Sequence, residues 1–187
     1  MKIRLAFDLH GVIMHLMPIM QKYYREVVGF ELVEKDRFNF DFPDHYKASR
    51  CGGDIARAIR TMAVPFAKPV RGSIQALNKW KNKGNEIVIV TASAPTTMDA
   101  NNEWSKKYFD RAQDYTIHRV SHQEGKLKKL MELGITHFVD DRFKTCNELA
   151  DYMTEVFLMD APCNRGRTSK ANVTRVRSLQ KVISLCS

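Results

Sequence analysis

Residues 3–12 of the chain are IRLAFDLHGV, in which a short apolar run ends at Asp8. A run of this length, rich in aliphatic and aromatic side chains, is typical of a strand in a parallel sheet whose two faces are both buried. In an open α/β sheet, ligands bind beyond the carboxyl ends of the strands. The stretch therefore predicts an α/β fold and makes Asp8 the first candidate for a functional residue.

Similar apolar segments recur along the chain, and segments of helical length separate them. The predicted strands, rich in β-branched or aromatic residues, are Ile3–Phe7, Glu86–Val90, Thr116–Val120, His137–Val139 and Val156–Met159. The predicted helices are Ser73–Lys83, Asn101–Phe109, Glu124–Leu133 and Thr145–Tyr152. Gly84 and Gly134 follow two of these helices, and glycine commonly ends a helix. The alternation predicts a doubly wound, mainly parallel sheet with helices between its strands.

The interval 15–69 interrupts this alternation and is too long for an ordinary loop in a compact domain. It contains two predicted helices, an aromatic stretch and a glycine break: Pro18–Val27, Phe38–Phe42, Gly52-Gly53 and Ile55–Ala63. The sequence therefore predicts a core domain of residues 1–14 and 70–187. Residues 15–69 are expected to form a small, mainly helical cap over the carboxyl ends of the strands.

Composition and charge indicate what size of core, which redox environment and which kind of ligand to expect. The 187 residues are 44% hydrophobic, enough for one core of ordinary size. The cysteines are too widely spaced for a zinc or dithiol motif, which favours a reduced, cytoplasmic protein: Cys51, Cys146, Cys163 and Cys186. Asp8 interrupts the first apolar run far short of a signal-peptide core or a membrane span, so we expect no membrane association. The net charge of +9 would attract phosphate-bearing ligands, although a surface that is basic only for solubility has the same charge.

Polar side chains gather where the predicted strands end. They are Asp8, Thr91-Ala92-Ser93 and Asp140-Asp141-Arg142, with Lys126 at the start of the helix before the fourth strand. Phosphoryl transfer needs a nucleophile, a metal ion, donors around the phosphate and an acid for the leaving group. Asp8 and Asp141 offer the oxygen ligands that Mg²⁺ prefers. A single aspartate after a strand is more often a turn or capping residue, so the functional interpretation depends on all these strand ends together.

These segments, in this order and on these strands, resemble the four motifs of the haloacid dehalogenase-like (HAD) superfamily over nearly the whole chain. Four segments also resemble its 5′(3′)-deoxyribonucleotidase branch: Glu86–Ala94, Asn102–Phe109, Val139–Arg142 and Phe157–Arg165. The resemblance implies a Rossmann-like, three-layer α/β sandwich with Mg²⁺ as cofactor. It also implies that Asp8 attacks phosphorus and that water then hydrolyses the aspartyl-phosphate.

The resemblance implies roles for individual residues. Three metal ligands are implied: the Asp8 carboxylate, the backbone carbonyl of His10 and the Asp141 carboxylate. Three phosphate-binding positions are implied: Thr91, Ala92 and Lys126. Asp140 either binds the metal through water or orients the other ligands, and the order of the two adjacent acids stays open. Lys126 is preferred to Lys128 and Lys129 because it opens the helix.

His10 departs from the family pattern, which normally has an aspartate as general acid and base at this place. Any residue can offer a backbone carbonyl, so metal binding need not depend on the difference. An imidazole, with a reference pKa of about 6.5, can also donate a proton. We therefore expect His10 to protonate the leaving group. The alternative is a catalytically weakened relative that is kept for binding.

Two further segments leave alternatives open. Phe38, Phe40 and Phe42 have strand-like spacing and form either core or, with Tyr46, a surface on which a nucleobase stacks. After Asp160 no acidic residue follows and six basic residues remain: Arg165, Arg167, Lys170, Arg175, Arg177 and Lys181. An apolar stripe of Val173, Val176 and Ile183 predicts a closing helix that packs on the core and has a basic outer face. The alternative is an arm that binds nucleic acid.

The sequence as a whole predicts a Mg²⁺-dependent phosphomonoesterase whose partner is a small phosphorylated substrate, with nucleoside monophosphates the favoured class. Three other functions stay open: a phosphatase of nucleic-acid ends, a phosphatase of another small metabolite, and a HAD-like binding protein with weakened catalysis. The basic tail favours the first of these and His10 favours the last.

Overall fold

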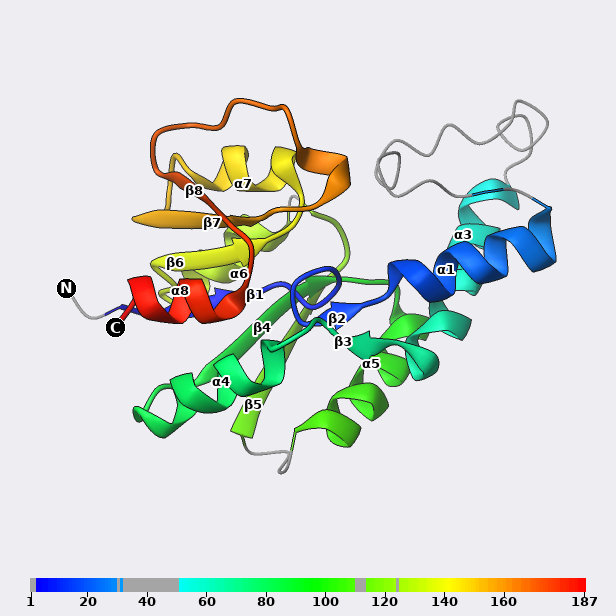
Figure 1. Ribbon diagram of the computed structural model, residues 1–187, viewed down its shortest axis with the longest axis horizontal. Coiled ribbons are helices and arrows are strands. Elements are labelled where there is room, and N and C mark those ends of the chain that lie inside the picture. Colours follow the sequence, from blue (N-terminus) through cyan, green and yellow to red (C-terminus); the bar gives the residue numbers. More distant parts are fainter. Residues whose placement is uncertain (1–2, 30, 32–50, 110–113, 124) are drawn as a thin grey trace.

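The computed structural model describes residues 3–29, 31, 51–109, 114–123 and 125–187, without the side chains of residues 51–54. Its centre is a six-stranded sheet in which every pair of neighbouring strands is parallel (Figure 1). From edge to edge the strands are β5 (Tyr115–Val120), β4 (Ile87–Ala92), β1 (Leu5–Phe7), β6 (His137–Asp140), β7 (Glu155–Met159) and β8 (Val173–Val176). The predicted α/β class and parallel sheet are confirmed.

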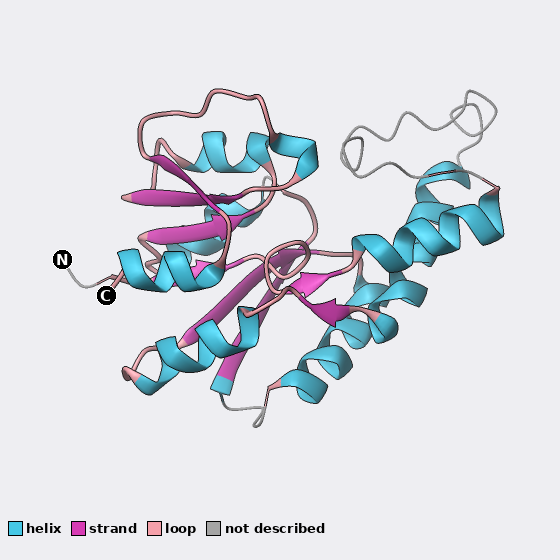
Figure 2. Ribbon diagram, viewed as in Figure 1, coloured by secondary structure: helices cyan, strands magenta, loops and turns pink. Residues whose placement is uncertain are grey.

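Helices cover both faces of this sheet (Figure 2). They are α4 (Ser73–Asn82), α5 (Pro95–Tyr108), α6 (Gly125–Glu132), α7 (Phe143–Leu149) and α8 (Leu179–Leu185), with a 3-10 turn η5 (Pro162–Asn164). Leu5 and Phe7 belong to a hydrophobic cluster with α4, α5 and α8. Ala6 belongs to a second cluster with α6 and α7. Two clusters on opposite faces of one sheet make the three-layer sandwich that the sequence predicts.

The apolar run of β4 shows why these residues form a central strand. Ile87 and Ile89 enter the first cluster, while Val88 and Val90 enter the second. Successive side chains of a strand point to opposite faces, so a continuous apolar run buries both faces of the sheet. The predicted helix ends are also confirmed, because Gly84 and Gly134 follow α4 and α6 with left-handed φ angles of 80° and 62°.

Two sequence predictions are wrong. The helix predicted from Asn101 begins at Pro95, since proline suits the first turn of a helix, where its missing N–H is not needed. The predicted closing helix does not include Val173 and Val176, which form the edge strand β8 beside β7. Val173 packs in one cluster and Val176 in the other, which is strand geometry, because residues three apart would share one face of a helix.

The chain leaves the core after β1 and returns before α4. Two short strands, β2 (Met14–His15) and β3 (Lys68–Pro69), pair antiparallel at the two ends of this insertion. Between them lie α1 (Met17–Tyr23), the π-helix η1 (Tyr24–Val28), α3 (Cys51–Ala63) and the 3-10 helix η3 (Val64–Phe66). The predicted aromatic stretch Phe38–Phe42 and Tyr46 lie outside the described residues.

The insertion is attached to the core along α5 (Figure 1). The hydroxyl groups of Thr61 on α3 and Thr97 on α5 lie 2.8 Å apart and share a hydrogen bond. The indole N–H of Trp104 donates to the carbonyl of Ala67 at 2.7 Å. These contacts hold the inserted helices beside the carboxyl edge of the sheet. Among the helices that the structure describes, none has the length and apolar character needed to cross a membrane.

Candidate active site

Strand β1 lies in the middle of the sheet, between β4 and β6. Its carboxyl end is therefore flanked by the ends of two strands that belong to opposite halves of the sheet, which is where open α/β sheets bind their ligands. Asp8 follows β1 directly, and its backbone N–H donates to the carbonyl of Val139 at 2.8 Å. This hydrogen bond brings Asp8 to the end of β6, where Asp140 and Asp141 follow.

The structure gathers the three predicted carboxylates in one buried cluster. Asp8, Asp140 and Asp141 are 6%, 0% and 2% exposed. One carboxylate oxygen from each lies within 4.8 Å of the others, so the three could hold a metal ion together. Oxygen ligands of this kind suit Mg²⁺.

Lys126 lies against this carboxylate cluster and is completely buried. Its ammonium group lies 2.7 Å from Asp140 Oδ2 and 3.1 Å from Asp8 Oδ1. Burial alone would lower the pKa of Lys126, but the negative charges of Asp140 and Asp8 outweigh burial and raise the pKa above its usual value. Lys126 therefore stays charged between Asp8 and Asp140.

Asp140 is held at both of its carboxylate oxygens. Its Oδ2 accepts a hydrogen bond from Lys126, and its Oδ1 accepts one from the backbone N–H of Arg142 at 2.8 Å. Burial raises the pKa of the Asp140 carboxyl, against the opposing effect of Lys126, and the nearby Asp8 adds to the rise. The pKa is raised because a buried negative charge beside another is unfavourable, and a bound cation would relieve this cost.

His10 is buried and anchored to the core helix α5. Its Nε2 lies 3.0 Å from Asn101 Oδ1, and Asn101 Nδ2 donates in turn to Ser93 Oγ at 3.3 Å. Because an amide oxygen can only accept a hydrogen bond, the proton of this contact belongs to His10 Nε2. Asn101 therefore sets the orientation of the imidazole ring. No local sequence pattern indicates this partner, because 91 residues separate His10 and Asn101 in the sequence.

A pocket of about 230 Å³ opens over the cluster. The core contributes Asp8, His10, Ala92, Gln123, Asp140, Asp141 and Arg142 to its lining, and the insertion and its entry contribute Leu16, Met17, Met20 and Arg60. Thr91 and Lys126 do not line this pocket. Thr91 is fully buried in β4, and its hydroxyl has no hydrogen-bond partner among the described residues. The structure therefore brings Asp8, His10, Ala92, Asp140 and Asp141 to one pocket, and Lys126 contacts two of these acids without lining the pocket.

No protein-family model matches the sequence, and no curated protein matches it either. Solved structures do match. A phosphonoacetaldehyde hydrolase-like protein from Oleispira antarctica has a TM-score of 0.67 and 14% identity, with 99% of this chain and 92% of that chain covered. A HAD hydrolase from Entamoeba histolytica has a TM-score of 0.65 and 12% identity, with 100% and 99% covered. A HAD phosphatase from Thermococcus onnurineus has a TM-score of 0.62 and 15% identity, with 99% and 97% covered.

The chain has a haloacid dehalogenase-like fold. The similarity extends over almost the whole length of this chain and of the three solved structures. At 12–15% identity it concerns the fold, and the chemistry of this HAD-like chain has to be argued from its own side chains.

Asn164 holds the backbone beside Asp141 in this HAD-like fold. The sequence alone does not indicate this role. Asn164 Nδ2 donates to the backbone carbonyls of Asp141 and Met159 at 2.8 and 2.7 Å. Arg175 on β8 donates to the Asn164 side-chain oxygen at 2.5 Å and to its carbonyl at 3.0 Å. The turn that carries Asp141 is thus tied to the ends of β7 and β8. The local signal was a single asparagine two residues after Pro162, which is too common in turns to indicate this role.

Proposed function

We propose that this chain is a Mg²⁺-dependent phosphomonoesterase that forms a covalent aspartyl-phosphate on Asp8. One observation carries the proposal: three buried carboxylates offer oxygen atoms within 4.8 Å of one another, and a buried ammonium contacts two of them, Asp8 and Asp140. Buried charges are costly unless they are paired or bind a metal ion. A divalent cation would neutralise this cluster, and a phosphate ester bound to that cation would lie beside a carboxylate nucleophile.

The donor set fits Mg²⁺, because the cluster offers oxygen atoms only. Asp8 and Asp141 would hold the ion together with the backbone carbonyl of His10. Asp140 would orient the cluster, since both of its oxygens already accept hydrogen bonds within the protein. When bound, the ion would offset the negative charge on the phosphate oxygens.

The chain's own residues supply the remaining steps. The Asp8 carboxylate attacks phosphorus, and the bond from phosphorus to the substrate oxygen breaks. His10, held by Asn101, gives a proton to the departing oxygen. Water then gives a proton to His10 and attacks phosphorus, and the bond from phosphorus to the Asp8 oxygen breaks, which releases phosphate and restores both Asp8 and His10. Lys126 keeps Asp8 in place and offsets its charge.

Phosphate binding is proposed for three positions. The unpartnered Thr91 hydroxyl is a donor without a use among the described residues. Ala92 lines the pocket at the end of β4. Lys126 keeps its charge within 3.1 Å of Asp8 and so lies close to the point of attack.

The favoured substrate is a nucleoside monophosphate. Support comes from the sequence segments that resemble the 5′(3′)-deoxyribonucleotidase branch. We propose that residues 15–69 act as the cap of this site, since the insertion supplies Met17, Met20 and Arg60 to the pocket. We also propose a cytoplasmic location, which agrees with Cys146 and Cys186 being buried thiols that form no disulfide.

The decisive assay measures phosphate release from nucleoside monophosphates, sugar phosphates and 3′-phosphorylated oligonucleotides, each with Mg²⁺ and with EDTA. We expect turnover of nucleoside monophosphates that requires Mg²⁺ and is absent in Asp8→Asn. Turnover that persists in EDTA would refute the metal dependence. Failure to hydrolyse any phosphate ester would refute the proposed function.

The role of His10 has its own test. If His10 is the leaving-group acid, His10→Ala should reduce turnover by roughly 10²–10⁴-fold. If His10 instead marks a weakened site, His10→Ala should match the parent and His10→Asp should be much faster. Equal turnover of the parent and His10→Ala would refute the hypothesis that His10 protonates the leaving group.

A further inference from the structure

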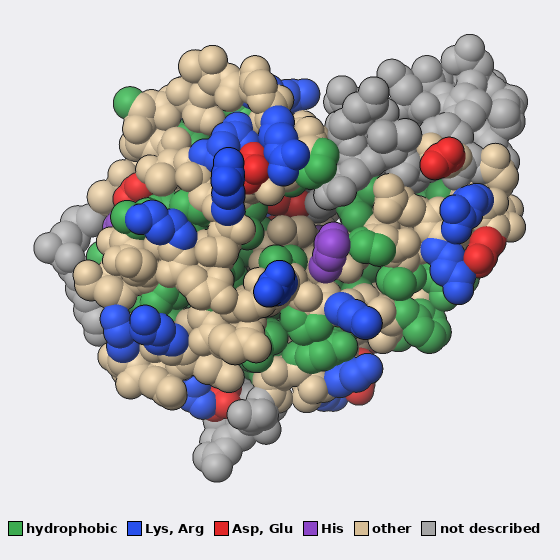
Figure 3. Space-filling view, viewed as in Figure 1, with side chains coloured by type: hydrophobic (Ala, Val, Ile, Leu, Met, Phe, Trp, Pro, Cys, Tyr) green, Lys and Arg blue, Asp and Glu red, His purple; other side chains and the backbone are tan. Residues whose placement is uncertain are grey.

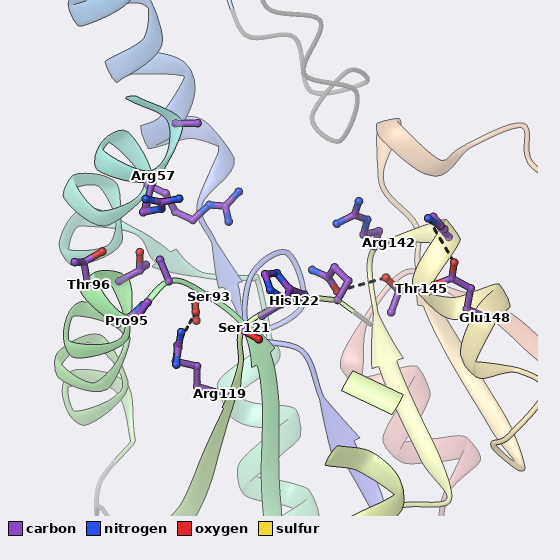
Figure 4. A pocket seen from close by; sticks show the side chains of 17 residues that line it. Arg57, Ser93, Pro95, Thr96, Arg119, Ser121, His122, Arg142, Thr145 and Glu148 are labelled. Atoms are coloured by element: carbon purple, nitrogen blue, oxygen red, sulfur yellow. Dashed lines mark hydrogen bonds and ion pairs between the residues drawn. The ribbon is translucent and has the colours of Figure 1, made fainter. Parts of the chain in front are cut away.

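A second and larger cleft adjoins the catalytic pocket (Figure 4). It has a volume of about 730 Å³ and is bounded by α3, the start of α5, the end of β5 and α7. Four residues line both spaces: Arg60, Ala92, Gln123 and Arg142. A ligand with its phosphate beside Asp8 can therefore extend past these shared residues into the cleft.

The cleft is strongly basic. Among the described residues that line it, five are cationic and one is a carboxylate: Arg57, Arg60, Arg119, Arg142 and Lys144, against Glu148. The carboxylate lies 3.6 Å from the ammonium group of Lys144, at the α7 side. Figure 4 shows Arg57 and Arg142 on opposite sides of the cleft, with Arg119 below them in this view. The positive charge therefore surrounds the space instead of covering one wall.

These arginines can bind an anion even where they also contact protein. A guanidinium group has five N–H donors in a planar fork that matches phosphate. Arg119 uses its Nε to donate to the Ser93 carbonyl at 2.7 Å, which fixes the side chain at the cleft and leaves its terminal nitrogens for other partners. Lys and Arg side chains are also widely spread over the face of the molecule in Figure 3, so a phosphate ester approaches through a positive field.

The start of α5 adds to this field. The helix begins at Pro95 after Ala94, without a side-chain cap, and its first turn lines the cleft. The N-terminus of a helix carries a partial positive charge that favours anions. This contribution supplements the side-chain charges and would not define a site alone.

Resting on the proposed function, we propose that the substrate's leaving group carries a second phosphate and that the basic cleft binds it. The pocket of about 230 Å³ would take the phosphoryl group that is transferred, and the cleft of about 730 Å³ has the size of a site for one small-molecule ligand. A nucleoside bisphosphate has this chemistry. A phosphorylated nucleic-acid end shares it, and the test separates the two sources.

The test measures binding to Asp8→Asn with Mg²⁺ present, so that no turnover is needed. Titration calorimetry compares thymidine 3′,5′-bisphosphate, thymidine 5′-monophosphate and a 5′-phosphorylated dinucleotide. We expect the bisphosphate to bind at least about tenfold more tightly than the monophosphate, as charge-assisted contacts from one or two arginines imply. Raising the salt concentration should reduce this preference.

Variants added to Asp8→Asn locate the effect. Arg57→Gln and Arg119→Gln should each reduce the preference for the bisphosphate severalfold. Lys79→Gln is the matched control, because Lys79 is exposed on α4 and does not line either space, and it should leave the preference unchanged. Arg119→Lys, which keeps the charge but not the fork, should retain part of the preference.

The outcomes separate this proposal from the proposed function. Equal affinity for monophosphate and bisphosphate, or an equal loss for both ligands in the arginine variants, would overturn the second-phosphate site. Tighter binding of the dinucleotide than of the bisphosphate would support the site and assign it to a nucleic-acid end. A bisphosphate preference in a protein that hydrolyses no ester would support the cleft and overturn the phosphatase.

Discussion

Charged residues are arranged differently at the carboxyl edge of the sheet and in the segment after Asp160. At the edge, three carboxylates are buried together, and the buried ammonium of Lys126 contacts two of them. In the C-terminal segment, Arg165 and Arg175 both lie 3.2 Å from Asp160, and Lys170 lies 2.6 Å from Asp151. The second set is mostly exposed and each cation has a carboxylate partner. The buried carboxylate cluster is the proposed ligand site, whereas exposed ion pairs of the second kind contribute little to stability.

The largest expected effect concerns Asp8. Asp8→Asn should reduce turnover to below about 1% of the parent, because a covalent nucleophile cannot be replaced by the other groups of the site. The same change should leave the melting temperature equal or higher, since it removes one of three mutually repelling carboxylates. Phosphate release and thermal melting measure the two effects. Residual turnover of more than a few per cent would contradict the role of Asp8 as nucleophile. A large loss of stability would contradict the view that the buried carboxylates repel one another.

Lys126 tests the same cluster through stability. Lys126→Met should lower the free energy of unfolding by about 3–5 kcal/mol in EDTA, because it leaves buried carboxylates without their cation. Mg²⁺ should recover part of the loss. The matched control is Lys128→Met on the same helix, where Lys128 is exposed and the change should be no more than about 0.5 kcal/mol. Equal effects of the two substitutions in denaturant unfolding would show that Lys126 does not balance the cluster.

Lys170 represents the C-terminal segment. Lys170→Gln removes an exposed ion pair, so the free energy of unfolding should fall by at most about 1 kcal/mol. Turnover should be unchanged, because Lys170 lines neither the pocket nor the cleft. A fall in the free energy of unfolding of more than about 2 kcal/mol, or slower turnover, would contradict the account. It would show that the exposed ion pairs of the C-terminal segment matter as much as the buried carboxylate cluster.

The smallest expected effect is on nucleic-acid binding by the C-terminal segment. An oligonucleotide without terminal phosphate should bind weakly at physiological salt, since three of the basic residues already contact carboxylates. Fluorescence anisotropy over a range of salt concentrations measures this. Tight binding with a steep salt dependence, lost in a variant that combines Arg177→Gln and Lys181→Gln, would instead support the alternative that the C-terminal segment binds nucleic acid.

Much of the fold could be predicted because local patterns determine it. Strand β1 and residues 87–90 of β4 are continuous apolar runs, and glycine follows α4 and α6. The edge strand β8 could not, because the spacing of Val173 and Val176 fits one face of a helix as well as two faces of a strand. The start of α5 could not be predicted either, because a proline followed by two threonines suits a turn as well as the beginning of a helix.

The candidate site also has one part that the sequence indicates and one part that it does not. Asp8 follows β1, Asp140 ends β6 and Asp141 follows it, and parallel strands bring their carboxyl ends to one edge. The partners that orient these groups come from distant parts of the chain, such as Asn101 for His10 and Asn164 for Asp141. The carboxylate partners of the basic tail, Asp151 and Asp160, likewise precede it in the sequence. Local sequence patterns show which residues end a strand but not which side chains meet them.

The most direct test of the central claim is to trap the aspartyl-phosphate. The parent protein is mixed with Mg²⁺ and a nucleoside monophosphate, quenched in acid and reduced with borohydride, which converts a phosphorylated aspartate to homoserine. The tryptic peptide of residues 5–22 is then analysed by mass spectrometry, and Asp8 is its only acidic residue. The account predicts the modification on this peptide in the parent and none in Asp8→Asn. Modification at Asp140 or Asp141 instead, or turnover without any modified peptide, would contradict it.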